Sequence, residues 1–122
     1  MHFLSADLEA YAEQNSEKEP SLLAALARET HLKVLQPRML SGHLQGRFLS
    51  LLSKLICPKY IVEIGTFTGY ATLCLAEGLS QEGFIHTIEV NEELEEIQNK
   101  YFEQSSYRSQ IIQHFAPALS VI

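Results

Sequence analysis

The stretch Val62-Glu63-Ile64-Gly65-Thr66-Phe67-Thr68-Gly69-Tyr70 decides the fold of this 122-residue chain. It continues from Tyr60 and Ile61, and residues 60–64 form a short β-branched run of the kind that makes a buried strand. Helical spacing of apolar residues follows from Tyr70 to Leu79, up to stop signals at Gly78 and Gly83. We therefore predict a strand, a glycine-containing turn and a helix.

The same unit recurs in the C-terminal part of the chain. Residues 84–90 predict a second strand, residues 92 to about 104 a second helix, and residues 110–115 a third strand. Strands that alternate with helices form a parallel sheet, because each helix returns the chain to the end where the previous strand began. We predict an α/β fold with a Rossmann-like parallel sheet and helices on both faces, in three layers.

The end of the sequence indicates that this fold is incomplete. A new apolar pattern of Ala118, Leu119 and Ile122 begins there and stops. In the strand order 3-2-1, the apolar strand 60–64 would also be an exposed edge, although such strands usually lie inside a sheet. We expect a sheet truncated after about three strands, and self-association through its uncovered edge or through the N-terminal helices.

Helices are predicted before the first strand, and their apolar stripes are expected to be packing surfaces. The stripes are Leu4, Leu8 and Tyr11 behind a cap at Ser5; Leu22, Leu23 and Leu26 behind Pro20; and Leu44, Phe48, Leu51, Leu52 and Leu55 in a helix over residues 43–56 capped by Ser41. We expect a single, incomplete domain over residues 1–122. Its N-terminal helices occupy residues 1–58, and a first β-α-β-α-β half occupies residues 59–122.

Composition and charge narrow the class of partner. The chain is 46% hydrophobic and 20% charged, as a globular domain is, and its formal net charge of −6 disfavours nucleic acid, which binds through Lys and Arg. It contains no apolar run long enough to cross a bilayer and no basic leader segment. Neither the two cysteines nor the five histidines show metal-ligand spacing. We expect a cytoplasmic chain with a small-molecule substrate, without nucleic-acid or membrane partners.

The turn after the first strand has the features of a ligand site. Gly65 and Gly69 allow the backbone to approach a ligand, and the following helix begins with unpaired N–H groups. A dinucleotide G-x-G-x-x-G fingerprint would need glycines where the chain has Phe67 and Tyr70. The pattern therefore disfavours a nicotinamide-dependent oxidoreductase, which stays open as an alternative.

Two acidic residues stand at the ends of the first two predicted strands. Glu63 follows apolar residues, where a carboxylate needs hydrogen bonds from a ligand or nearby backbone. Glu89 ends the second strand, where nucleotide-binding α/β proteins place an acid that accepts hydrogen bonds from ribose hydroxyls. The turn and the second acid together predict a nucleoside ligand.

These residues resemble the first motif of the catechol and caffeoyl-CoA O-methyltransferase family, which are class I enzymes that use S-adenosylmethionine. That motif, E-x-G-x-x-x-G-Y-S, is matched by Glu63, Gly65, Gly69 and Tyr70, with Ala71 in place of serine. Upstream, residues 39–46 are similar to the family's M-x-x-G-x-x-x-G loop over the cofactor. The resemblance covers roughly residues 20–122 and implies the N-terminal, cofactor-binding half of such an enzyme.

The resemblance also implies roles for individual residues. The methionine end of S-adenosylmethionine would be held by Glu63 and the backbone of Gly65, Thr66 and Phe67, and the ribose by Glu89. The remaining positions are Val90 against the adenine, Met39 and Ser41 closing the site, Gly69, Tyr70 and Ala71 in the motif, and Ala116, Pro117 and Ala118 in the position of the adenine loop. Ala71 and Ala116 depart from the family's serine and glycine.

In this family a divalent metal of the Mg²⁺ type and a lysine act on the acceptor, and their positions lie beyond Ile122. We therefore expect the metal only in the complete enzyme, no catalytic residue in this chain, and no activity of this chain alone. The resemblance further implies methyl transfer to a hydroxyl of a small acceptor, and a dimer. The alternative is a non-catalytic fragment that self-associates.

Overall fold

The sheet contains three parallel strands in the order β1-β2-β3. The computed structural model describes residues 3–122, and its strands are β1 (Tyr60–Ile64), β2 (Phe84–Glu89) and β3 (Ile111–Phe115). Ile85 lies in the middle strand, paired with Ile61 on one side and Ile111 on the other. The predicted parallel sheet is confirmed, and β1 is one of its edges, as expected.

Helices precede and connect these strands. They are α1 (Ala6–Gln14), α2 (Ser21–Lys33), α3 (Gly42–Ile56), α4 (Tyr70–Ala76), α5 (Glu95–Gln104) and α6 (Ala118–Val121), with 3-10 turns η1 (Pro37–Met39), η2 (Glu92–Leu94) and η3 (Arg108–Gln110). Helix α4 ends before the predicted Leu79, and the first turn of the predicted helix 92–104 is 3-10. Ser5 caps α1, since its Oγ accepts a hydrogen bond from the Leu8 N–H group at 3.4 Å.

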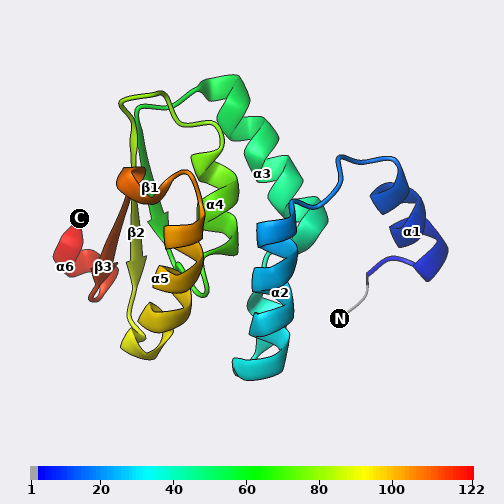
Figure 1. Cartoon of the computed structure of the whole chain (residues 1–122), viewed down its shortest axis with the longest axis horizontal. Helices are drawn as coiled ribbons and strands as arrows, with labels where there is room; N and C mark the ends of the chain where they lie inside the picture. The colour runs from blue at the N-terminus through cyan, green and yellow to red at the C-terminus, as the bar shows by residue number, and fades with distance from the viewer. Residues whose placement is uncertain (1–2) are drawn as a thin grey trace.

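The core lies between the sheet and the helices α2, α4 and α5, which occupy one side of it (Figure 1). Leu26 of α2, Ile85 of β2 and Phe102 of α5 are each fully buried there. Burying a large apolar side chain contributes about 1.5–3 kcal/mol, so each of these three residues stabilises the packing of its element in the core. The stripe predicted for α2 is a packing surface, as expected.

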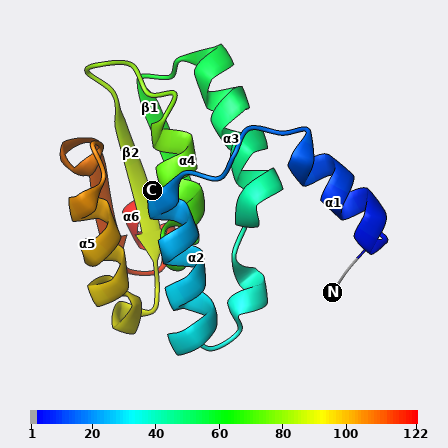
Figure 2. The same ribbon diagram turned by 45° about the vertical axis from the view of Figure 1, so that its right-hand side comes forward.

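The other face of the sheet is largely uncovered. Within residues 3–122, the short helix α6 is the one helix that lies on that side (Figures 1 and 2). Tyr60, Val62 and Ile64 of β1 point to this side and are between 61% and 67% exposed. Helices were predicted on both faces of the sheet, and on this face α6 is the one helix among the described residues.

The packing surface predicted for α3 is wrong. Among the predicted stripe, Phe48, Leu51 and Leu55 are exposed, whereas Gly46, Arg47, Ser50 and Ser53 are buried against α4. Close approach of the two helices explains the reversal, because a Cβ atom at Gly46 would lie 2.7 Å from the Tyr70 ring. The stripe Leu4, Leu8 and Tyr11 is likewise exposed, since α1 has no buried residue.

An ion pair joins the buried polar face of α3 to the end of α4. The Arg47 guanidinium donates through Nη1 to Glu77 at 3.1 Å and through Nη2 to the second oxygen of the same carboxylate. Hydrogen bonding to Glu77 raises the pKa of Arg47 above its already high value, so the charge is permanent. Bidentate pairing of this kind fixes geometry as well as charge, so it sets how α3 sits on α4.

Candidate cofactor site

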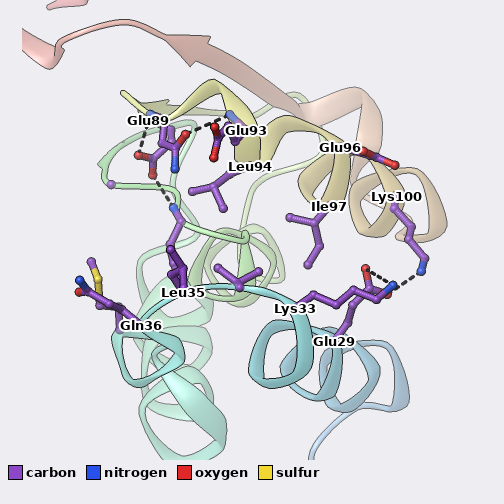
Figure 3. A pocket seen from close by; sticks show the side chains of 15 residues that line it. Glu29, Lys33, Leu35, Gln36, Glu89, Glu93, Leu94, Glu96, Ile97 and Lys100 are labelled. Carbon is purple, nitrogen blue, oxygen red and sulfur yellow. Dashed lines mark hydrogen bonds and ion pairs between the residues drawn. The ribbon is translucent and has the colours of Figure 1, made fainter.

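A cavity of about 810 Å³ opens at the carboxyl ends of β1 and β2. Such a volume lies within the range of small-molecule sites, and this edge is where parallel α/β sheets bind ligands. Figure 3 shows its acidic and basic side chains together with the apolar side chains of Leu35, Leu94 and Ile97, of which Leu94 is buried and Leu35 is exposed. The lining residues are Glu29, Lys33, Val34, Leu35, Gln36, Met39, Gly65, Phe67, Glu89, Asn91, Glu93, Leu94, Glu96, Ile97 and Lys100.

A smaller cavity of about 40 Å³ lies beside the first. It is lined by Met39, Leu40, Ser41, Gly65, Thr66, Phe67, Tyr70 and Ala71. Met39, Gly65 and Phe67 line both cavities and so form the boundary between them. Most of the residues expected to hold the methionine end are therefore brought together here, around one turn of chain.

The turn after β1 is held against β2 by backbone hydrogen bonds. The N–H groups of Gly65 and Thr66 both donate to the carbonyl of Ile88, at 2.8 and 3.2 Å. Gly65 has a positive φ of 95°, and a Cβ atom built on it would meet nothing within 4 Å. The space beside the Gly65 backbone is therefore open, which is what the predicted close approach of a ligand requires.

Gly69 has a different role from the one predicted. Its φ is also positive, at 99°, but a Cβ atom there would lie 2.5 Å from the Phe102 ring. Glycine at this position lets the start of α4 pack against α5, and Gly69 lines neither cavity. The expectation that Gly69 admits a ligand is not supported by this geometry.

Glu89 lies at the entrance of the large cavity with its carboxylate held by backbone groups. Its Oε2 accepts from the Phe67 N–H group at 2.8 Å, and its Oε1 accepts from those of Val90 and Asn91 at 3.0 and 3.2 Å. A carboxylate offers about four acceptor positions, so about one remains, on Oε2. The carboxylate is thus fixed in orientation and can still accept a hydrogen bond from a ligand hydroxyl.

Glu63 is paired with hydroxyl groups and not with backbone. Its Oε1 accepts from Thr72 at 2.5 Å and from Thr87 at 2.6 Å, and Thr87 also contacts the buried Thr66 hydroxyl. Glu63 lines neither cavity, so it lies behind the turn, as part of its support. Burial raises the pKa of the Glu63 carboxyl, while the Thr72 and Thr87 hydroxyls oppose that rise.

The stability of the chain should fall as the pH rises through the titration of Glu63. Its pKa is raised above the ordinary value of 4.5, so the folded chain binds this proton more tightly than the unfolded chain does. Protonated Glu63 therefore stabilises the folded chain at low pH. This stabilisation is lost as the pH rises from about 4.5 to the pKa of Glu63 in the folded chain. Glu63→Gln should flatten this part of the pH profile and make the chain more stable than wild type at pH 7.

Chemical denaturation between pH 4 and pH 7 measures this effect, and one group can contribute at most about 1.4 kcal/mol per pH unit. Glu82→Gln is the matched control, because Glu82 is an exposed acid between α4 and β2. Equal pH profiles for the wild type and Glu63→Gln would show that the Glu63 carboxylate costs nothing in the fold.

The remaining motif residues near the small cavity differ in their exposure and in their contacts. Met39 is exposed at its rim, and Ala71 lines it. Ser41 also lines it and precedes α3, but its side chain makes no capping hydrogen bond, so that prediction is wrong. Tyr70 is buried, and its hydroxyl donates to Glu19, which makes it chiefly a packing residue between α4 and the segment before α2.

The residues expected around the adenine lie outside both cavities. Val90 is exposed, and the Ala116 N–H group donates to the carbonyl of Glu89 at 3.1 Å. Pro117 is the N-cap residue of α6, and Ala118 is its first residue. The 116–118 segment thus lies beside the end of β2 without lining either cavity, and its role at the adenine stays a prediction.

Sequence reasoning missed several residues of this region. Residues 34–36, after α2, line the large cavity, although no motif marks them. Gln98 donates to the carbonyl of Phe67, and a signal for it exists, because it is a polar residue four positions after the buried Leu94 on the apolar stripe of α5.

Two features are absent from the described residues 3–122. They contain no group of three or more His, Cys, Asp or Glu side chains placed to hold a metal ion. None of their helices combines the length and the apolar character that a bilayer crossing needs.

Comparisons with known proteins agree with this geometry. Residues 12–122 match the family model described as O-methyltransferase. Caffeoyl-CoA O-methyltransferase 2 of Petunia hybrida is 40% identical over 78 residues, which are 64% of this chain and 32% of the relative. Catechol O-methyltransferase of Mycobacterium tuberculosis is 30% identical over 104 residues, which are 85% of this chain and 46% of the relative.

A solved structure, the O-methyltransferase from Bacillus cereus in complex with SAH, superimposes with a TM-score of 0.86 and 28% sequence identity. The superposition covers 94% of this chain and 52% of the other. The chain therefore spans between about a third and a half of the length of these relatives. The motif, the fold and the match over residues 12–122 together show that the chain belongs to the O-methyltransferase family.

Proposed function

We propose that this chain binds S-adenosylmethionine and its product S-adenosylhomocysteine as the N-terminal half of an enzyme that methylates a hydroxyl group of a small molecule. The observation that carries the proposal is the pairing of Gly65, whose backbone is open to a ligand, with Glu89, whose carboxylate has an acceptor position left. Relatives with the same fold are complexes with SAM and SAH.

The residues present divide the work of holding the cofactor. The Glu89 carboxylate accepts a hydrogen bond from a ribose hydroxyl group. The amino-acid end of the cofactor lies against the open backbone at Gly65 and in the small cavity beside it. Thr66 keeps the turn rigid through Thr87, so little ordering entropy is lost on binding. When bound, the cofactor supplies an electrophilic methyl group on sulfur, which an acceptor oxygen attacks.

The acceptor and the divalent metal belong to the complete enzyme. The family's metal would lower the pKa of the acceptor hydroxyl and align it with the methyl group. Residues 3–122 contain no group of three or more His, Cys, Asp or Glu side chains placed to hold a metal ion. We expect this chain to bind the cofactor without turning over substrate. We also expect it to reside in the cytoplasm.

Calorimetric titration of the chain with S-adenosylhomocysteine tests the proposal. We expect binding, no binding of NADH, and affinity about ten-fold weaker in Glu89→Gln, since the amide offers one acceptor oxygen where the carboxylate offers two. Glu92→Gln removes the same charge three residues along the chain, outside both cavities, and should bind as wild type does. Binding of NADH alone would overturn the cofactor assignment.

We further propose that the chain forms a homodimer. The exposed apolar residues Phe48, Leu51 and Leu55 on α3, together with the edge strand β1, support this, because soluble monomers rarely expose such patches. Sedimentation at increasing concentration should show a dimer, and Leu51→Glu should shift it towards monomer. A single monomeric species at every concentration would contradict the proposal.

A further inference from the structure

A buried glutamine of α5 donates a hydrogen bond to a backbone carbonyl group in the turn after β1. Gln98 is fully buried, and its Nε2 donates to the carbonyl oxygen of Phe67 at 2.6 Å. Its Oε1 in turn accepts from Nε2 of Gln113 on β3, at 2.8 Å. Both ends of the buried amide are therefore paired, which offsets the free energy of removing it from water.

Phe67 needs such support because its backbone is in the left-handed region, with φ at 51°. This conformation is unfavourable for residues that carry a Cβ atom, and it persists where neighbouring groups fix it. The Phe67 N–H group donates to Glu89, and the Phe67 carbonyl accepts from Gln98. These two groups belong to different peptide planes, so together they fix both backbone angles of Phe67.

The position of Phe67 matters because it lines both cavities. Its N–H group also orients the carboxylate of Glu89, which lines the large cavity. A change in the Phe67 backbone would therefore move the boundary between the cavities and the carboxylate at the same time.

We propose that Gln98, supported by Gln113, is a positioning residue for the cofactor. It fixes the left-handed backbone of Phe67 and, through that backbone, the direction of Glu89. The cofactor part of this inference rests on the proposed function, whereas the hold on Phe67 does not depend on any ligand.

Amide hydrogen exchange measured residue by residue tests the hold on Phe67. In Gln98→Met, the Phe67 amide should exchange about ten-fold faster relative to the amides of β2, because its backbone is released. The control Ile111→Val weakens the buried β3 packing and should alter Phe67 and β2 alike. The double variant Gln98→Met with Gln113→Leu leaves no unpaired buried amide, so it tests the same point if the single variant fails to fold.

Titration with S-adenosylhomocysteine tests the effect on the cofactor. Gln98→Met should bind about ten-fold more weakly than wild type, and Ile111→Val equally well. An unchanged exchange rate of the Phe67 amide in both Gln98 variants would show that Gln98 does not fix the Phe67 backbone. Faster exchange with unchanged affinity for S-adenosylhomocysteine would overturn the positioning role. If wild type binds no cofactor, the proposed function and the cofactor role fail together, and the exchange result still decides the hold on Phe67.

Discussion

Gly78→Ala is expected to lower the free energy of unfolding by about 3 kcal/mol or more and the melting temperature by about 10 °C. A Cβ atom at Gly78 would lie 2.2 Å from the carbonyl carbon of Ser53 and 2.3 Å from the Lys54 nitrogen. Both are backbone atoms of α3, so no side-chain rotation can relieve the overlap. The helices would have to separate, which would also break the hydrogen bond from Ser53 Oγ to the Leu75 carbonyl.

The expected loss of stability in Gly78→Ala is informative because Gly78 does not have a positive φ. Alanine in place of glycine at such a position ordinarily stabilises a protein by about 0.4–1 kcal/mol through the unfolded state. Thermal and chemical denaturation measure the change. Adding Ser53→Ala should not restore stability, since it removes the contact with Ser53 Oγ at 2.3 Å and leaves both overlaps with backbone atoms. Stability equal to wild type, or rescue by Ser53→Ala, would show that α3 and α4 are not so closely packed.

The same close contact explains why sequence reasoning placed α3 the wrong way round. Its leucines repeat at helical spacing, and such a stripe ordinarily faces the core. Here small residues, Gly46 and Ser53, face α4, and Arg47 finds its partner in Glu77. Periodicity reports which residues share a face, but it does not say whether a neighbour inside this chain covers that face.

The sheet was predictable because each strand is short, β-branched and followed by a turn and a helix. The direction and the edge position of β1 followed from that alternation and from the order of the strands. The place of Glu89 beside the large cavity was predictable for the same reason, because the carboxyl end of β2 is fixed by the topology.

The support of the site was less predictable than its position. Glu63 and Gly69 match the motif, yet Glu63 pairs with Thr72 and Thr87, and Gly69 makes room for Phe102. Gln98 belongs to no motif, and its only signal is that it is a polar residue on the apolar stripe of α5. These roles depend on contacts between elements far apart in the sequence, which a local pattern does not contain.

Gly65→Ala is expected to abolish binding of S-adenosylhomocysteine, with an affinity loss of about 100-fold or more. The space around Gly65 is open in the chain itself, with nothing within 4 Å of a Cβ atom built there. Gly65 also lines both cavities, so a methyl group would stand where the ligand has to approach the backbone. The loss would therefore come from overlap with the ligand and not from a clash inside the fold.

Gly42→Ala provides the matched control for this variant, because Gly42 stands in the loop 39–46 that resembles the family's cofactor loop and yet lines neither cavity. Gly42 also has a positive φ, 80° against 95° for Gly65, and it is equally free of neighbours within 4 Å, but it lines neither cavity. Both variants should lose about 1–2 kcal/mol of stability, because alanine is strained in a left-handed conformation. Calorimetric titration should then separate them, with binding lost in Gly65→Ala and kept in Gly42→Ala. Equal affinity in the two variants would mean that the cofactor does not approach the turn after β1, even if it binds elsewhere on the chain.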